Sequence, residues 1–423
     1  MNSKKILVGE MAENLIGSEI IKLGGEINDR IRKGEKIFNY TIGDFDPKIF
    51  PIPTELTQAI VDAYHSGHTN YPAANGILEL RKEVSAFLMK YEDLTYFPDE
   101  ILITGGARPG IYATYLTIVD KGDKVVYPLP SWNNNHYCHL VGANGIGVET
   151  KAENNFMPTA AELKPHIKDA VLLSLCSPLN PTGTTFSREQ LEEICDMVIE
   201  ENKNRNENQK PLYLLYDQIY WVLTFGETEH YSPVTIHPGM RDYTIFVDGM
   251  SKAFGATGIR VGWTFGPMEI IDKMKSILSH IGAWSPKAEQ VACAAYLMNH
   301  DAVKKFLEDF KKNIYTRLQN IYDGFMQLKQ KGFAVDCLMP QAAIYLAIQF
   351  KLKGKIKSDG KVLEKTEDVT AYILEQTGIA VVPFYAFGSS TESDWYRLSV
   401  GTCRMEDIPN AMERLELALG KLK

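Results

Sequence analysis

Short runs of consecutive apolar residues alternate with longer amphipathic segments through the first two thirds of the chain. The segment 187–202 carries apolar residues at helical spacing behind Ser187, a residue type that favours a helix N-terminus. Continuous apolar strands separated by helices predict a mostly parallel sheet covered by helices on both faces. The runs that we interpret as buried strands are 123–128, 170–175, 211–217, 244–249 and 260–266.

The pattern changes after about residue 284. Ser285 and Pro286 predict the start of a helix, with the serine as its cap and the proline at its first position. Residues 301–328 repeat apolar side chains at steps of three and four, which predicts one long amphipathic helix that leads to a second domain. That domain is expected to be a smaller α+β unit, and the polar tracts 201–210 and 351–368 are expected to be solvated loops. Its strand-like runs are 342–350, 378–384 and 395–401.

Composition limits the possible classes of protein. A chain of 423 residues with 45% hydrophobic and 23% charged residues is long enough for two domains and ordinary for a soluble globular protein. The formal net charge of −8 argues weakly against nucleic acid as the main partner. The N-terminal sequence lacks the long apolar run of a signal peptide, and no window offers the roughly 18 apolar residues of a membrane helix. These features favour a cytoplasmic protein without a membrane partner.

The cysteines suggest neither a metal site nor a disulfide framework. The six of them are scattered and form no CxxC pair, so we expect reduced, structural thiols and no bound metal.

A glycine pair at 105–106 stands between an apolar strand and a helix expected to start near Pro109. Glycines allow a tight turn, and the free amides at a helix start bind anions. Pro109 has no N–H group, so the amides of Ala107 and Arg108 would be the donors. The alternative is a plain turn, which this pattern alone indicates more often.

Other polar or aromatic side chains follow further predicted strands. Trp132 lies in an expected loop, where it could pack internally or offer a flat face to a ring. Asn180 lies in an Asn-Pro-Thr-Gly turn, where it could also donate to a ligand. Asp217 ends an apolar strand, with Tyr220 three residues later. Burying a carboxylate is costly without a partner, and a protonated ring nitrogen would be such a partner.

The stretch 248–263 places Lys252 and Arg260 among four glycines. Lysine avoids burial, and glycine weakens regular structure, so the backbone here is expected to pass close to a ligand.

Taken together and in this order, these segments resemble the fold-type I, class I/II family of pyridoxal-phosphate-dependent aminotransferases, most closely its aspartate aminotransferase branch. The resemblance extends from about residue 41 to residue 401, and 249–262 matches the lysine-site pattern of the family throughout. It implies an α/β large domain with a mostly parallel, seven-stranded sheet between helices, at 45–300. A smaller α+β domain would comprise 1–44 and 301–423.

The resemblance also implies roles for individual residues. Lys252 would bond the aldehyde of pyridoxal 5'-phosphate, and Arg260 would bind its phosphate together with the backbone at Ala107 and Arg108. Trp132 would stack on the cofactor ring.

Further roles concern the ring substituents and the substrate. Asp217 would pair with the ring nitrogen, whereas Tyr220 and Asn180 would bind the phenolic oxygen. Arg397 would clamp the substrate α-carboxylate, and Gly43 would belong to a loop that closes over the substrate.

A tyrosine of the family reaches the phosphate from the neighbouring subunit. Tyr71 matches that tyrosine, which would make the active form a homodimer. One position departs from the pattern, because many relatives have a phosphate-binding serine where this chain has Gly249. The missing hydrogen bond would come from Ser251, water or a backbone amide.

The implied reaction moves an amino group from an amino acid to a 2-oxo acid, commonly 2-oxoglutarate, by a ping-pong mechanism. Arg108 stands where one subgroup has a lysine that binds the distal carboxylate of the substrate, which favours aspartate or glutamate. Alternatively, Arg108 could pair with a protein acid or point to solvent, and Asp44 would oppose an acidic side chain if it faced the pocket.

Three other functions remain open at this point. The same scaffold could serve a carbon–sulfur lyase or an aminotransferase for aromatic or neutral amino acids. A ligand-sensing regulator on this fold would carry a DNA-binding module, for which the chain has no room before residue 40.

Overall fold

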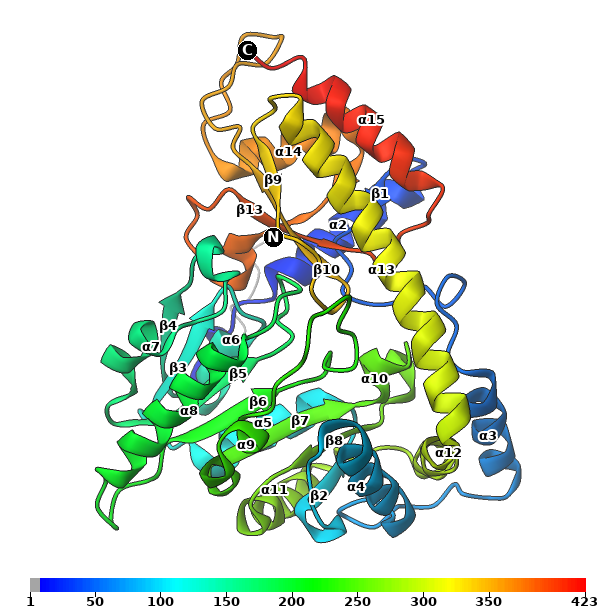
Figure 1. Cartoon of the computed structure of the whole chain (residues 1–423), viewed down its shortest axis with the longest axis vertical. Helices are drawn as coiled ribbons and strands as arrows, with labels where there is room; N and C mark the ends of the chain where they lie inside the picture. The colour runs from blue at the N-terminus through cyan, green and yellow to red at the C-terminus, as the bar shows by residue number, and fades with distance from the viewer. Residues whose placement is uncertain (1–7) are drawn as a thin grey trace.

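A computed structural model describes residues 8–423, so the expected small-domain segment 1–44 lies partly outside the described residues (Figure 1). Its largest feature is a seven-stranded sheet with the strand order β2-β8-β7-β6-β5-β3-β4. Only β8 runs antiparallel to its neighbours, which confirms the prediction of a mostly parallel sheet. The strands are β2 (Ile101–Thr104), β3 (Lys124–Leu129), β4 (Asn144–Glu149), β5 (Ala170–Cys176), β6 (Tyr213–Asp217), β7 (Thr244–Gly249) and β8 (Gly262–Phe265).

Both faces of this sheet are buried. Alternate residues of a strand point to opposite faces, so Leu214 and Tyr216 of β6 join one apolar core while Leu215 joins the other. The helices whose residues cover the Leu215 face are α5 (Ala107–Ile118), α6 (Asn134–Val141) and α11 (Met268–Ile281). The helices in the core on the other face include α4 (Leu78–Glu92), α7 (Ala160–Ile167), α8 (Arg188–Lys203) and α12 (Lys287–Met298). This double cover explains why the central strands are continuous apolar runs.

The two helices that we predicted in detail are present. The Ser187 hydroxyl accepts a hydrogen bond from the Gln190 amide and caps α8. The long helix α13 (His300–Gln330) buries all eight apolar positions of the predicted stripe and extends from α12 to the second sheet (Figure 1). The expected cap at Ser285 is wrong by one residue: Pro286 has extended backbone and its carbonyl accepts from Gln290, so α12 begins at Lys287.

The second part of the fold contains a four-stranded antiparallel sheet with the order β12-β13-β10-β9. A parallel pair, β1 with β11, joins the N-terminal segment to this part of the chain. The strands are β1 (Phe38–Asn39), β9 (Val335–Cys337), β10 (Tyr345–Phe350), β11 (Ile379–Ala380), β12 (Val382–Pro383) and β13 (Trp395–Ser399). The remaining helices are α1 (Glu10–Glu13), α2 (Glu19–Arg32), α3 (Thr54–His65), α9 (Pro233–Ile236), α10 (Met250–Ala253), α14 (Thr366–Thr377) and α15 (Asp407–Leu419).

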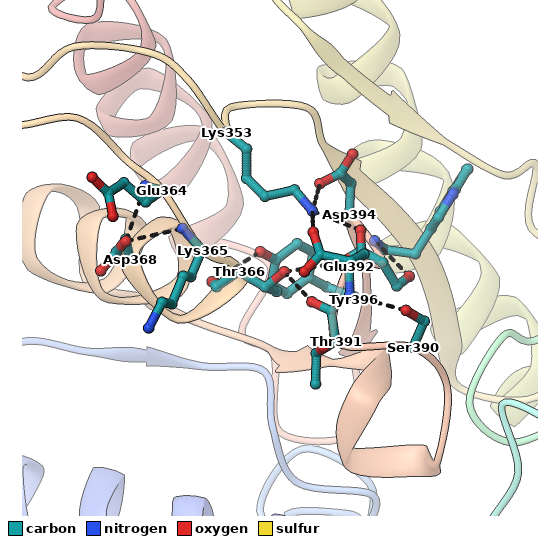
Figure 2. A network of polar contacts seen from close by, with 12 residues as sticks. Lys353, Glu364, Lys365, Thr366, Asp368, Ser390, Thr391, Glu392, Asp394 and Tyr396 are labelled. Atoms are coloured by element: carbon teal, nitrogen blue, oxygen red, sulfur yellow. Dashed lines mark hydrogen bonds and ion pairs between the residues drawn. The ribbon is translucent and has the colours of Figure 1, made fainter.

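The tract 351–368, expected to be a solvated loop, is partly anchored. Figure 2 shows Lys353 between two carboxylates of the segment before β13: its Nζ lies 3.1 Å from Glu392 Oε2 and 3.3 Å from Asp394 Oδ1. In the same network, the Thr366 hydroxyl donates to two backbone carbonyls of this segment, at 2.8 and 3.2 Å. These contacts hold the start of α14 against the segment that leads into β13.

Among residues 8–423, no helix has the length and apolar character needed to cross a membrane. All six cysteines lie in this range as free thiols, five buried and one partly exposed.

Candidate active site

A cavity of about 540 Å³ opens at the carboxyl ends of β5 and β6, where ligands bind in open α/β sheets. It is lined by residues of both sheets and of the loops between them. All the predicted site residues contribute to its wall except Tyr71: Gly43, Ala107, Arg108, Trp132, Asn180, Asp217, Tyr220, Ser251, Lys252, Arg260 and Arg397. Segments that are more than 300 residues apart in the sequence therefore meet in one cavity.

Lys252 lies on α10, the short helix that directly follows β7. Its Nζ donates to the carbonyl of Gly43 at 2.7 Å, so the lysine contacts the loop expected to close over the substrate. Burial is the largest cause that lowers the pKa of Lys252, to about 8, and nearby arginines lower it further against the opposing charge of Asp44. A lysine with this pKa is a far better nucleophile and base near neutral pH than an ordinary one.

Asp217 is the last residue of β6 and lies in the cavity wall. Burial raises the pKa of its carboxyl group to about 6, against the lowering effects of a hydrogen bond from the Ile219 amide and of the Lys252 charge. A half-buried acid of this kind is a suitable partner for a cationic ring nitrogen, because such a pairing would offset the cost of its desolvation.

Positive charge gathers at the start of α5. The Arg260 guanidinium donates to the carbonyls of Thr257 at 2.6 Å and Gly105 at 3.0 Å. Burial, and then the charge of Arg108, lower the pKa of Arg260. Among the described residues, no carboxylate lies within ion-pair distance of Arg260 or Arg108, so the cationic end of this helix is free to bind an anion.

The glycine at the start of α5 makes this arrangement possible. Gly106 has a φ of +88°, and a Cβ atom there would lie 2.0 Å from a guanidinium nitrogen of Arg260. Because Gly106 caps the helix, α5 begins at Ala107, two residues before the expected start near Pro109. The amides of Ala107 and Arg108 therefore belong to the first turn, as the anion-site interpretation requires.

Close packing explains the glycine at position 249. A Cβ atom on Gly249 would lie 2.7 Å from Gly262 Cα and 2.9 Å from the Val261 carbonyl oxygen. A serine there would therefore require the backbone of β8 to move. Ser251 lines the same cavity two residues later and offers a hydroxyl in its place.

Arg397 projects from β13 and is buried. Its guanidinium donates to Asn180 Oδ1 at 3.0 Å and to the Thr41 carbonyl at 2.6 Å, and it lies 4.9 Å from the ring centres of Tyr345 and Phe387. Its Nε has no hydrogen-bond partner within residues 8–423. A buried cation with donors to spare is suited to a carboxylate ligand. Asn180 therefore both accepts a hydrogen bond from Arg397 and lines the cavity.

Of two further aromatic residues predicted for the site, Trp132 lines the cavity and Tyr71 does not. The Arg108 guanidinium lies 5.2 Å from the ring centre of Trp132, so these two residues form one wall of the cavity. Tyr71 is 81% exposed and does not line the cavity of its own chain; its ring packs edge-on against Trp284, with the centres 5.2 Å apart.

Sequence reasoning assigned no role to several residues of the cavity wall, among them Ile20 and Tyr345. Ile20 comes from α2 and Tyr345 comes from the start of β10. The apolar run 342–350 predicts a strand. The contact between Tyr345 of this strand and Tyr220 depends on how the two sheets pack together, and the local sequence gives no signal for it.

The residues present fit pyridoxal phosphate. The cavity offers an amine of lowered pKa, a carboxyl group for a ring nitrogen, three phenols, and a cationic helix start where Gly106 leaves no room for a side chain. Each group of the cofactor thus has a residue of suitable chemistry in one cavity.

Known proteins share this architecture over almost its whole length. A crystal structure of the aspartate aminotransferase from Rhizobium meliloti matches with a TM-score of 0.90 and 27% identity, covering 99% of this chain and 100% of that one. An aromatic aminotransferase from Pyrococcus horikoshii OT3 matches with a TM-score of 0.80 and 26% identity, over 93% and 98% of the two chains. The fold is therefore that of the aspartate aminotransferases.

The family follows from the sequence. The family model described as aminotransferase class I and II matches residues 35–415, so the chain belongs to that family, which uses pyridoxal phosphate, and is an aminotransferase. It is also 29% identical over 413 residues to an aspartate aminotransferase of Rhizobium meliloti (strain 1021), covering 96% of this chain and 94% of that one.

Proposed function

We propose that the protein transfers an amino group from aspartate, or another acidic L-amino acid, to a 2-oxo acid such as 2-oxoglutarate, with pyridoxal phosphate bonded to Lys252. The observation that carries this proposal is one cavity in which Lys252, Asp217 and the cationic start of α5 lie together. That combination suits an aldehyde, a ring nitrogen and a phosphate on one ligand.

The residues that we propose to bind the cofactor are those that line the cavity. The amides of Ala107 and Arg108, with the Arg260 guanidinium and the Ser251 hydroxyl, bind the phosphate. Asp217 binds the ring nitrogen, and Trp132 covers the ring.

The remaining side chains hold the other reacting groups. Tyr220 and Asn180 bind the phenolic oxygen. Arg397 binds the α-carboxylate of the amino acid, and the loop at Gly43 closes over it.

When bound, pyridoxal phosphate supplies an aldehyde that accepts the amino group and a ring that withdraws electrons from the α-carbon. Lys252, with its lowered pKa, would hold the cofactor aldehyde and would accept the α-proton of the bound amino acid at its neutral Nζ. Asp217 would keep the ring nitrogen protonated, and Arg397 would hold the α-carboxylate of the amino acid in place beside Lys252. A 2-oxo acid then enters the same site and the steps run in reverse, which makes the kinetics ping-pong.

The proposed preference for an acidic substrate rests on Arg108. It lines the cavity, contacts Trp132, and has no carboxylate within ion-pair distance among residues 8–423. The alternative in which a protein acid neutralises it therefore has no support, whereas the exposure of Arg108 agrees with the alternative in which it points to solvent. Asp44 also lines the cavity, but its Oδ1 accepts from Thr257 Oγ1 at 2.7 Å, which turns part of its charge toward the protein.

Arg108→Met tests this preference. Methionine keeps most of the length and removes the charge, so kcat/KM for aspartate should fall roughly 10²-fold, as expected for a lost charge-assisted contact, while that for alanine should change little. Arg108→Lys is the matched control and should retain most of the discrimination. Equal losses for both substrates would remove the argument for an acidic side chain, and a wild-type preference for phenylalanine would favour an aromatic aminotransferase.

The lowered pKa of Lys252 gives a pH prediction for the cofactor-free protein. Only the neutral amine attacks an aldehyde, so the rate of covalent attachment should rise about tenfold per pH unit below a pKa of about 8 and level off above it. The measurement is the appearance of bound-cofactor absorbance after mixing, compared with a peptide lysine of normal pKa. A rate that keeps rising to pH 10 would contradict the lowered pKa of Lys252.

We further propose a homodimer in which Tyr71 reaches the phosphate of the neighbouring subunit. Its exposed ring, outside the cavity of its own chain, supports this reading.

We also propose the domain limits 45–300 for the large domain and 1–44 with 301–423 for the small one, and a cytoplasmic location. The position of α13 between the two sheets supports the division near residue 300.

A further inference from the structure

Two buried phenols meet inside the cavity. The hydroxyl oxygens of Tyr220 and Tyr345 lie 2.6 Å apart, and their rings are arranged edge to face with centres 5.5 Å apart. Tyr220 follows β6 of the large sheet, whereas Tyr345 begins β10 of the small sheet. The contact therefore joins the two parts of the fold at the cavity.

The direction of this hydrogen bond follows from the number of protons. Burial raises the pKa of both phenols, so each keeps its single proton near neutral pH. A phenol has one proton to donate and lone pairs with which to accept. If Tyr220 donates its proton to the phenolic oxygen of the cofactor, it has none left for Tyr345. The short contact then requires Tyr345 to donate to the Tyr220 oxygen.

The surroundings of Tyr345 hold it in position for this donation. The Arg397 guanidinium lies 4.9 Å from the centre of its ring, and a cation there favours negative charge on the phenol oxygen and so strengthens it as a donor. The closing loop packs directly on the hydroxyl, because a Cβ atom on Gly43 would lie 2.7 Å from it. Tyr345 therefore contacts the carboxylate-binding arginine, the closing loop and Tyr220 at once.

We propose that Tyr345 is a positioning residue that polarises Tyr220 and strengthens the hydrogen bond from Tyr220 to the phenolic oxygen of the cofactor. Hydrogen bonds in a chain polarise one another in a site of low dielectric constant, so the first bond strengthens the second. This inference rests on the proposed function, because it requires pyridoxal phosphate bonded to Lys252.

The test is Tyr345→Phe in the cofactor-loaded protein, read by the pH dependence of the bound cofactor's absorbance. A weaker hydrogen bond leaves the phenolic oxygen more basic, so it holds the neighbouring proton of the lysine linkage to a higher pH. We expect the spectral midpoint to rise by roughly half to one pH unit and kcat to fall about fivefold, the effect of one weakened buried hydrogen bond. The KM for the amino acid should stay within about twofold, since the Arg397 contacts remain.

Tyr220→Phe provides the matched comparison. Alone, it should raise the midpoint by more than Tyr345→Phe does, because it removes the direct donor. In the double variant, the change at Tyr345 should add nothing, because its effect passes through the Tyr220 hydroxyl.

Three results would overturn the proposal: an unchanged midpoint in Tyr345→Phe, an equal additional shift in the Tyr220→Phe background, or a raised KM with unchanged kcat. The last result would show that Tyr345 only supports Arg397. Failure of the proposed function is a separate observation, since wild-type protein would then show no absorbance from a cofactor bonded to Lys252.

Discussion

Lys252→Ala should reduce the turnover of every amino acid by about 10⁴-fold or more, because one side chain holds the cofactor aldehyde and moves the α-proton. The fold should survive, since the cost of burying the Lys252 amine, which lowers its pKa to about 8, disappears with the substitution. Steady-state transamination with aspartate and 2-oxoglutarate measures the loss. The phosphate contacts remain, so cofactor should still bind without a covalent bond.

A small amine added to Lys252→Ala provides the control for this prediction. Methylamine can occupy the space of the missing side chain and should restore a small part of the turnover in proportion to its concentration. Turnover within about tenfold of the wild type, without added amine, would show that another base removes the proton and would contradict the role of Lys252.

The sequence predicts most of the architecture because buried positions favour apolar residues, and the spacing of these residues identifies strands and helices. Strands that are covered on both faces, such as β6 and β7, consist mainly of apolar residues, and α13 repeats its apolar residues at helical spacing. Helix starts are less certain, because several residues can cap. Helix α5 begins earlier than predicted because Gly106, with its positive φ, caps it. Helix α12 begins one residue later than predicted because Pro286 has extended backbone.

The site could be predicted only as far as known patterns place its residues. The lysine segment and the strand-end residues match a family pattern, and their side chains do gather in one cavity. The contacts that distinguish this chain depend on spatial packing. The approach of Gly249 to Gly262 and the pairing of Tyr220 with Tyr345 join segments that have no local signal for each other.

Arg397→Leu should have the second largest effect. It removes the cation that would bind the α-carboxylate, and two charge-assisted hydrogen bonds lost together should lower kcat/KM for amino acids by roughly 10²- to 10³-fold. Asn180 and the Thr41 carbonyl would lose their donor as well, since both accept from this guanidinium. The measurement is kcat/KM for aspartate in the wild type and in the variant.

An amine without an α-carboxylate separates substrate binding from general damage at Arg397. Leucine at this position should leave the slow reaction of such an amine almost unchanged. Arg397→Lys should lie between the wild type and Arg397→Leu, because lysine keeps the charge but not the planar fork. Equal losses for the amine and for aspartate would mean that Arg397 holds the cavity together instead of binding substrate.

The central claim is that Lys252 holds pyridoxal phosphate in a site that accepts amino groups from acidic amino acids. The most direct test is a single half-reaction: cofactor-loaded protein is mixed with one amino acid and no 2-oxo acid, and absorbance is followed. We predict loss of the band of the lysine-bonded cofactor and growth of the pyridoxamine phosphate band, fastest with aspartate or glutamate. Release of pyruvate and ammonia without pyridoxamine phosphate would indicate a lyase, and no band of a lysine-bonded cofactor would contradict the claim itself.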